Sequence, residues 1–247
     1  IQELAAQAII CGAITLEQLE AIAQNLETTL QQAINEKLSQ ANQTPINAEQ
    51  LKTTAALFPN ALVDSELGEI PEGWEVGVVG DLFELHRGFD LPKKDRKDGT
   101  YSVFAAGGYH GQHAEFKMEP PGIITGRSGV IGNVYLSLEK YWPLNTTLYV
   151  REFKKCGPYY AYFYLLGCDL KAINSGSAVP SLNRNFVHSL TCSIPGSDLL
   201  DEFEQVLTAS FKKIKLNEDE SEKLSVIRDV LLPKLLSGVV DLNGVDE

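Results

Sequence analysis

The longest regular pattern of hydrophobic positions in the chain runs through residues 198–236. Apolar and small polar residues fall there at alternating steps of four and three, and the pattern continues after a one-residue shift. The stripe consists of Phe203, Leu207, Ser210, Ile214, Asn217, Ser221, Leu224, Ile227, Leu231 and Leu235. This heptad spacing predicts one helix that is capped by Asp198 and is roughly 58 Å long at 1.5 Å per residue.

A helix of that length is unusual in a compact domain, because globular helices typically run to about 20 residues. Packing of the whole helix on its own domain is the alternative. The length instead favours a second helix beside it, either from this chain or from another copy. We therefore predict a helix interface formed by Phe203, Leu207, Ile214, Leu224, Ile227, Leu231 and Leu235.

The first 63 residues also follow a helical pattern. Thr15 opens a capping box before an apolar stripe that ends near Leu38. Asn47 is a second predicted cap, and the short helix that it opens closes before Pro59. These segments are acidic and rich in Gln, and no motif in them resembles a site, so we expect them to pack or to connect.

Short strands dominate the middle of the chain. Residues 64–74 are rich in Gly and Pro, which indicates a domain boundary. Apolar runs then predict strands at 76–79, 101–106, 122–125, 130–138 and 146–151, a helix at 159–170 and a last strand at 190–194. The predicted fold is mixed α/β: short helices in residues 1–63, a β-rich domain in 64–196, and a long coiled-coil-forming helix with a tail in 197–247.

Charge is distributed unevenly along the 247 residues, although the net charge is -12. Residues 1–80 carry a net charge of -9 and residues 191–247 a net charge of -6. The middle, residues 81–190, has 13 basic and 10 acidic residues and all four histidines. A basic middle between acidic flanks can bind an anion locally while the flanks stay away from it.

The sequence lacks the usual marks of an enzyme or a membrane protein. Neither a phosphate-binding P-loop nor a dinucleotide-binding glycine motif is present, and the four cysteines have no metal-ligand spacing. We expect free buried thiols, no metal and no cofactor. A hydrolase that uses Ser128 or a histidine would need a paired base, which no motif supplies. No apolar run approaches the roughly 18 residues of a membrane span, which predicts a cytoplasmic protein.

Four polar segments of the basic middle are candidates for contact with an anionic ligand. The first, residues 87–97, concentrates positive charge that suits phosphates, although a solvated loop has the same composition. Its candidate residues are Arg87, Lys93, Lys94, Arg96 and Lys97.

The other three candidate segments are residues 105–113, 125–131 and 174–185. We interpret them as loops, and we expect the arginine in the Gly-flanked turn at 125–131 to point into solvent, where it suits phosphate or guanine. A plain hairpin turn and a flexible loop are the alternatives for the last two segments. The candidate residues are Tyr109, His110, Gln112, Arg127, Ser128, Ser177 and Arg184.

Four sequence runs together resemble one protein family. They are E-L-G-E-I-P-E-G-W-E-V at 66–76, I-T-G-R-S-G-V-I-G at 124–132, S-G-S-A-V-P-S-L-N-R at 175–184 and L-L-P-K-L-L-S-G at 231–238. In order and spacing they resemble the specificity subunit of type I restriction-modification enzymes from about residue 55 to the end. The helices before that point match loosely.

The resemblance implies a non-catalytic DNA-reading protein. One target recognition domain, here residues 71–195, would read half of a bipartite site in double-stranded DNA. The long helix would act as a spacer and dock methyltransferase subunits, which modify adenine using S-adenosylmethionine, and through them the restriction subunit. An interaction module that binds no DNA and oligomerises through the helix is the alternative.

The chain departs from the family pattern because it has one recognition domain and one long helix instead of two. A half-length subunit that pairs with a second copy and a C-terminal fragment of a longer chain both fit. The first residue is Ile1 and the only methionine is Met118, which favours the fragment. In both cases the helix stripe predicts a homodimer.

Overall fold

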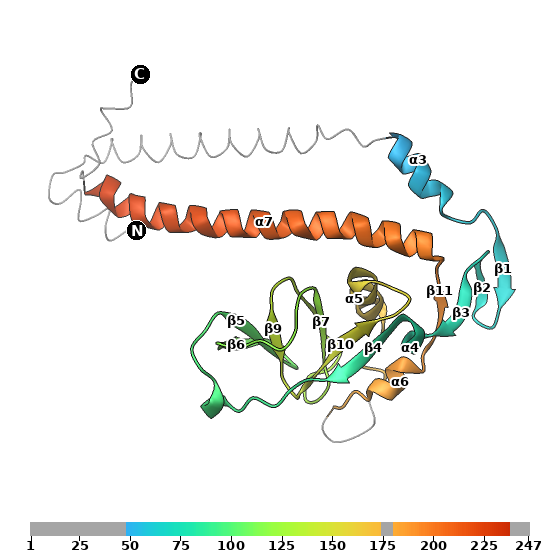
Figure 1. Ribbon diagram of the computed structural model, residues 1–247, viewed down its shortest axis with the longest axis horizontal. Coiled ribbons are helices and arrows are strands. Elements are labelled where there is room, and N and C mark those ends of the chain that lie inside the picture. Colours follow the sequence, from blue (N-terminus) through green and yellow to red (C-terminus); the bar gives the residue numbers. More distant parts are fainter. Residues whose placement is uncertain (1–47, 174–179, 238–247) are drawn as a thin grey trace. The chain divides into compact units, whose positions relative to one another are not determined.

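The computed structural model describes residues 48–173 and 180–237. It divides the chain into two compact units, one of Leu51–Lys212 and one of Ile1–Gln50 with Lys213–Glu247. The helix predicted between Thr15 and Leu38 lies outside the described residues. Figure 1 labels the elements, which are α3 (Ala48–Ala56), β1 (Leu62–Ser65), β2 (Gly68–Pro71), β3 (Glu75–Val78), α4 (Val79–Leu82), β4 (Phe83–Arg87), η1 (Lys93–Asp95), β5 (Tyr101–Ala105), β6 (Gly108–His113), β7 (Gly122–Gly126), β8 (Val134–Ser137), β9 (Tyr141–Pro143), β10 (Thr147–Phe153), α5 (Pro158–Gly167), α6 (Arg184–His188), β11 (Thr191–Ile194) and α7 (Ser197–Leu236).

A four-stranded antiparallel sheet in the order β4-β10-β7-β8 forms the centre of the Leu51–Lys212 unit. Its middle strands are apolar on both faces, as the buried runs of β7 and of the first half of β10 show. Phe83 and Leu85 of β4 and Ile123 of β7 are fully buried in the main hydrophobic cluster. Burial of side chains of this size stabilises the fold by about 1.5–3 kcal/mol each.

A three-stranded sheet in the order β6-β5-β9 packs its own small core. β5 and β6 form an antiparallel hairpin, and β9 runs parallel to β5. Val103, Trp142 and Leu144 are buried together there. Because β9 leads directly into β10, the turn between them joins the two sheets.

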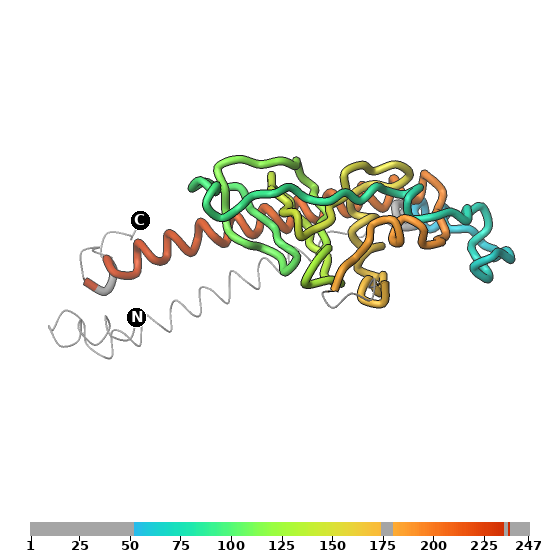
Figure 2. The backbone as a smooth tube through the Cα atoms, turned by 90° about the horizontal axis from the view of Figure 1, so that it is seen from below, coloured from blue at the N-terminus to red at the C-terminus, as the bar shows by residue number. Residues whose placement is uncertain are grey.

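Segments from both ends of the domain close it. β11 pairs with β3 in antiparallel register, and the Val79 N–H donates to the Leu190 carbonyl at 2.9 Å. Figures 1 and 2 both show the orange α6–β11 segment beside the blue-green β3–α4–β4 segment. Nε2 of His188 in α6 accepts the Leu85 N–H at 2.8 Å, and burial lowers the pKa of this imidazole. The neutral form of His188 is therefore part of the fold.

The first turns of α7 pack on α5 through aromatic rings. Phe211 stacks on Tyr159 with ring centroids 4.8 Å apart, and Phe203 meets Tyr160 edge-on at 5.8 Å. The Glu204 carboxylate accepts the N–H groups of Tyr159 at 3.2 Å and Tyr160 at 2.7 Å, which otherwise lack partners at the start of α5. Phe203, predicted as a helix-interface residue, thus packs within its own domain.

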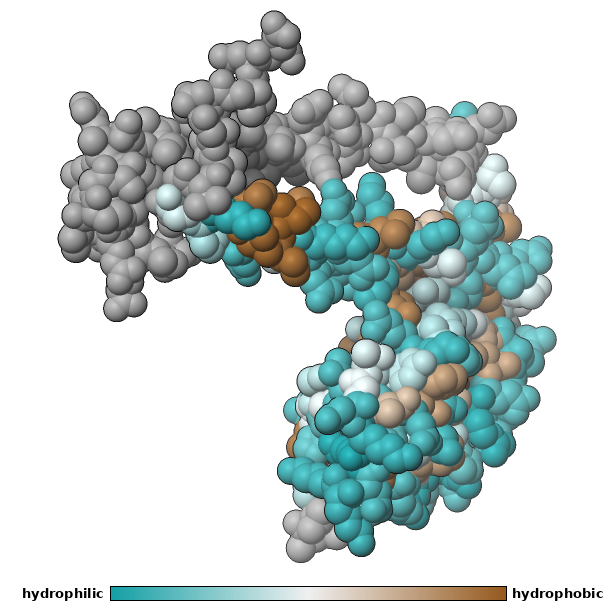
Figure 3. All heavy atoms as spheres, turned by 60° about the vertical axis from the view of Figure 1, so that its left-hand side comes forward, coloured by the Kyte–Doolittle hydropathy of each residue, from teal (hydrophilic) through white to brown (hydrophobic). Residues whose placement is uncertain are grey.

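Beyond Lys212, the described part of α7 is largely solvent-exposed. Its exposed apolar residues are Ile214, Leu216, Leu224, Val226, Ile227, Val230 and Leu231. Figure 3 shows brown hydrophobic atoms gathered on this helix, whereas the visible face of the domain is mostly teal. No helix in the described ranges is both long enough and apolar enough to cross a membrane.

The predicted fold class is confirmed, as are the short helix before Pro59, the helix after residue 158 and the strand before Pro195. Several elements differ. β1, β2, β4, β9 and α6 had not been predicted, and the segment 105–113 is a hairpin with β6 rather than a loop. Asp198 lies inside the first turn of α7 rather than capping it, since the helix begins at Ser197. The β4 segment was missed because its alternation of apolar and polar residues is only five residues long.

Candidate nucleic-acid interface

Three strand ends meet at one edge of the central sheet. Because neighbouring strands are antiparallel, the end of β4, the start of β10 and the end of β7 lie side by side. Leu148 of β10 pairs with Arg87, and Thr147 pairs with Gly126, the residue before Arg127. Two candidate arginines that are distant in sequence therefore lie at the same edge.

The turn before β10 holds the Arg127 segment in place. The N–H groups of Arg127 and Ser128 donate to the Thr146 carbonyl at 2.8 and 3.2 Å. Nε of Arg127 donates to the Asn145 carbonyl at 3.0 Å. Arg127 is partly buried and its Nε is engaged, so this residue is less open to solvent than the sequence suggested. Its two terminal nitrogens are not used in these contacts and are the groups that can meet a ligand.

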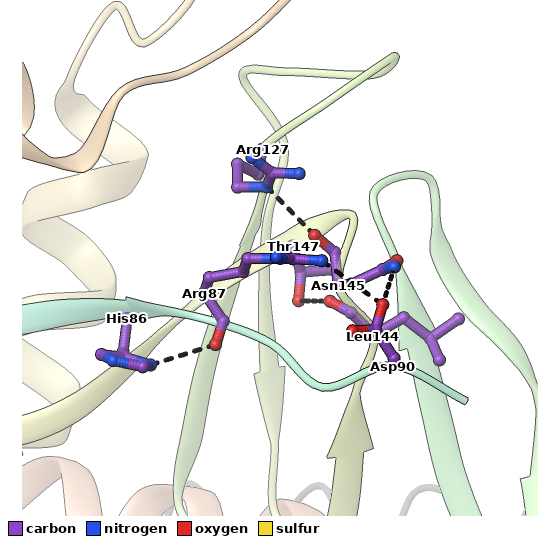
Figure 4. A network of polar contacts seen from close by, with 7 residues as sticks. All are labelled: His86, Arg87, Asp90, Arg127, Leu144, Asn145 and Thr147. Carbon is purple, nitrogen blue, oxygen red and sulfur yellow. Dashed lines mark hydrogen bonds and ion pairs between the residues drawn. The ribbon is translucent and has the colours of Figure 1, made fainter.

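Asp90 links this turn to the end of β4. Its carboxylate accepts from Nη2 of Arg87 at 3.3 Å and from Nδ2 of Asn145. The Arg87 and Asp90 side chains are 50% and 68% exposed. Figure 4 shows Arg87 and Arg127 approaching the Asp90–Asn145 pair from different strands, with His86 beside the Arg87 carbonyl. A chain of polar contacts from Arg87 to Arg127 thus follows the sheet edge.

Two glycines allow the backbones at this edge to approach closely. A side chain at Gly88 would overlap the carbonyl oxygens of Leu144 and Pro143, and one at Gly126 would overlap the Val130 carbonyl. The N–H of Gly88 itself donates to the Thr147 carbonyl at 3.1 Å. The backbone frame around the arginines is therefore fixed independently of the arginine side chains.

The segment after residue 180 runs beside the Arg127 turn. Leu182 donates its N–H to the Arg127 carbonyl at 2.8 Å, and Ser128 forms a β-bridge with Ser181. Nη1 of Arg184 lies 3.5 Å from the Leu85 carbonyl and is partly buried, so this candidate contacts β4. Ser177 lies outside the described residues.

The β5–β6 hairpin presents three candidate side chains next to this edge. Tyr109 is 64% exposed, and His110 and Gln112 are also exposed. The Ala106 N–H at the hairpin turn donates to Oγ1 of Thr146 at 3.3 Å, which joins the hairpin to the turn that holds Arg127.

The side chains of the basic cluster at residues 93–97 differ in their exposure and in their hydrogen bonds. Lys93 and Lys94 are exposed on η1. Lys97 is also exposed, and its Nζ lies 3.6 Å from Oε1 of Glu115. Nη1 of Arg96 instead donates to the His110 carbonyl at 2.8 Å. The Arg96 Nε is buried and has no hydrogen-bond partner in the described part of the chain. Arg96 therefore supports β6.

Three residues of this edge were absent from the candidates predicted from sequence. Asp90 is an acid within a basic segment, Asn145 directly precedes the run 146–151 that was predicted as a strand, and Thr146 is the first residue of that run. Their roles depend on contacts between β4, the β9–β10 turn and the Arg127 turn, which no local pattern reports.

The described residues contain no group of three or more His, Cys, Asp or Glu side chains that could hold a metal ion. Cys156, Cys168 and Cys192 are free thiols, and burial raises the pKa of Cys156 to about 12. Such a thiol stays protonated and behaves as a small apolar side chain. Cys11 lies outside the described residues.

Comparison with known proteins adds independent findings. A family model described as the type I restriction modification DNA specificity domain matches residues 71–225. The type I restriction enzyme MjaIX specificity subunit of Methanocaldococcus jannaschii is 25% identical over 194 residues, which cover 69% of this chain and 45% of that protein. This chain thus spans less than half the length of that curated relative.

One solved structure shows the same fold. The S subunit of a type I restriction-modification system from M. genitalium matches with a TM-score of 0.55 at 17% sequence identity, over 66% of this chain and 46% of that chain. The HsdS subunit from Thermoanaerobacter tengcongensis matches over 91% of this chain and 59% of that chain, at 12% identity and a TM-score of 0.43.

Proposed function

Because the chain belongs to the type I restriction modification DNA specificity family, we propose that it reads one half of a bipartite site in double-stranded DNA. The observation that carries the proposal is the sheet edge where Arg87 and Arg127 lie together beside the exposed β5–β6 hairpin. Base edges are read by side chains of this kind, and arginine binds O6 and N7 of guanine.

The proposed contacts divide into two classes. Arg87, Arg127, Tyr109, His110 and Gln112 contact base edges, because they lie at the sheet edge or on the adjoining hairpin. Exposed lysines contact phosphates and set the register without reading sequence. The phosphate-contacting set is Lys93, Lys94 and Lys97, and Arg96 supports β6. Ser128 and Arg184 complete the proposed surface, and Ser177, which lies outside the described residues, stays a candidate from the sequence.

The long helix supplies the proposed assembly surface. The exposed apolar residues of α7 beyond Lys212 pair with a second helix and dock methyltransferase subunits, and the restriction subunit joins through them. Such a stripe would be an unusual free surface for a monomer. The chain itself is non-catalytic in this scheme, and the partner subunits methylate adenine and cut DNA.

The decisive experiment is selection of bound duplexes from a randomised DNA pool, with the methyltransferase subunit present and salt near physiological. We expect enrichment of a short motif. A symmetric repeat of that motif at fixed spacing indicates that two copies pair. A folded, assembled preparation that enriches no motif, or whose binding ignores salt, contradicts DNA reading and favours an interaction module, since DNA affinity depends steeply on salt.

Two substitutions separate the proposed contact classes. Lys93→Ala should weaken binding to all sequences and reduce the salt dependence, because one phosphate contact is lost. Arg127→Ala should relax preference at one base pair, by about 1–3 kcal/mol. Unchanged affinity and preference for Arg127→Ala would exclude that residue from the interface.

A further inference from the structure

We propose that Asp90 is a positioning residue for sequence reading. With Asn145, it fixes the orientation of Arg87 relative to Arg127, and its negative charge lowers affinity for DNA of any sequence. The inference rests on the proposed DNA-reading function. Asp90 itself need not touch a base.

The geometry gives one carboxylate two partners from different parts of the chain. Asp90 follows β4 and accepts from Arg87 at 3.3 Å, and it also accepts from the Asn145 side chain in the β9–β10 turn. The carbonyl of the same Asn145 accepts Nε of Arg127 at 3.0 Å. Figure 4 shows this relay, in which Arg87 contacts Asp90, Asp90 contacts the side chain of Asn145, and the carbonyl of Asn145 contacts Arg127. Moving Asp90 therefore disturbs Arg87 directly, whereas Arg127 keeps its contact with the main-chain carbonyl of Asn145.

Fold stability does not explain this arrangement. The Arg87–Asp90 pair is more than half exposed, and an ion pair so open to water contributes little to the free energy of unfolding. The backbone frame of the edge is made by other contacts, including the Gly88 N–H bond to the Thr147 carbonyl. The carboxylate instead restricts the rotamers of the long Arg87 side chain, which would otherwise become ordered only on binding.

The position of the charge has a second effect. A carboxylate on the surface that faces DNA is repelled by the phosphate charge of every duplex equally, whatever the sequence. An arginine that is already oriented, in contrast, favours only the base whose acceptors match it. One residue thus raises discrimination between sequences while it lowers general affinity, and these two effects have opposite signs in a binding measurement.

The test uses Asp90→Asn in the full chain assembled with the methyltransferase subunit. Dissociation constants are measured for the selected target, for targets changed at each base pair and for a random duplex. We expect the random duplex to bind more tightly, while preference at one or two base pairs falls about tenfold. Asn145→Ala should relax the same base pairs, and the double variant should lose no more preference than the larger single loss, because both residues act through one relay.

Glu119→Gln is the matched control. It removes the same charge from an exposed acid that pairs with Lys140 at 3.0 Å, away from the arginine relay, and preference should be unchanged. If Asp90→Asn tightens binding to all duplexes equally and keeps full preference, Asp90 is only background charge and the inference is wrong. If the wild-type assembly shows no preference at all, the DNA-reading function itself is wrong, which is a distinct result.

Discussion

The two parts of α7, Ser197–Lys212 and the described residues beyond Lys212, share one heptad pattern of apolar residues. They differ in the residues that pack against them. In Ser197–Lys212, Leu200 is buried, Phe211 stacks on Tyr159, and Glu204 caps α5. In the described residues beyond Lys212, Leu224 is 56% exposed and Ile227 is exposed to a similar degree. A heptad stripe therefore indicates which face of a helix is apolar, but it does not identify what covers that face.

Phe211→Ala tests the first part and should have the largest effect. Phe211 is only partly buried, so loss of the ring and of its stacking on Tyr159 should lower the free energy of unfolding by about 2 kcal/mol. Urea unfolding monitored by circular dichroism measures it. Leu224→Ala is the matched control and should change stability by less than about 0.5 kcal/mol. Equal losses would remove the contrast between the two parts.

Leu224→Asp with Ile227→Asp tests the second part. On the proposed assembly, two charges on the exposed stripe should weaken self-association or docking at least tenfold, because each would be buried without a partner. Analytical ultracentrifugation with and without the methyltransferase subunit measures this. The unfolding transition of the domain should stay in place. A variant that assembles normally would show that another surface makes the contact.

The sequence predicted much of the fold, because burial leaves a periodic record. Apolar runs located the buried strands β7 and β10, and a run rich in aromatic residues located α5. It could not locate β9, which is three residues long, or β6, whose sequence G-Y-H-G-Q-H is mostly polar. These strands form because neighbours pair with them, and pairing between distant segments leaves no local signal.

The candidate site was predicted in composition but not in arrangement. Arg87 was chosen as part of a basic segment and Arg127 as the arginine of a Gly-flanked turn, and the sheet places them at one edge. Arg96 was chosen for its charge, yet its guanidinium binds the His110 carbonyl. Composition shows which groups are present, whereas their hydrogen-bond partners decide which of them can face a ligand.

Glu204→Gln sharpens the comparison through pH. Burial raises the pKa of the Glu204 carboxyl above its ordinary value of 4.5. This effect is larger than the opposing effect of the two N–H groups that donate to the carboxylate. The folded state then holds this proton more tightly than the unfolded state, so its contribution to the free energy of unfolding is greatest below pH 4.5 and is lost as pH rises through the raised pKa. Gln does not titrate, so this substitution should abolish that trend.

The pH trend is read from the difference in unfolding free energy between wild type and Glu204→Gln across pH 4 to 8. Glu222→Gln, an exposed acid in the second part of α7, should show no such trend. An identical trend in both variants would mean that Glu204 is not specifically coupled to folding.

Lys215→Ala should have the smallest effect. Nζ of Lys215 lies 2.9 Å from Oδ1 of Asp219, one turn along the helix. Such ion pairs contribute about 0.3–0.5 kcal/mol to the free energy of unfolding. Thermal melting at low and high salt measures the loss, which should disappear at high salt. A loss of several kcal/mol would indicate that this part of α7 is structurally constrained in a way that its exposure does not suggest.

The close backbone approach at Gly88 and Gly126 has a consequence for retargeting the protein. The turn that carries Asn145 is held mainly by main-chain groups and by space that only glycine leaves, not by the identity of residues 87 and 127. A library that varies positions 87, 90, 109 and 127 while both glycines stay constant should therefore yield folded proteins with new preferences. The backbone of this edge thus stays the same, while the side chains that contact DNA can be exchanged.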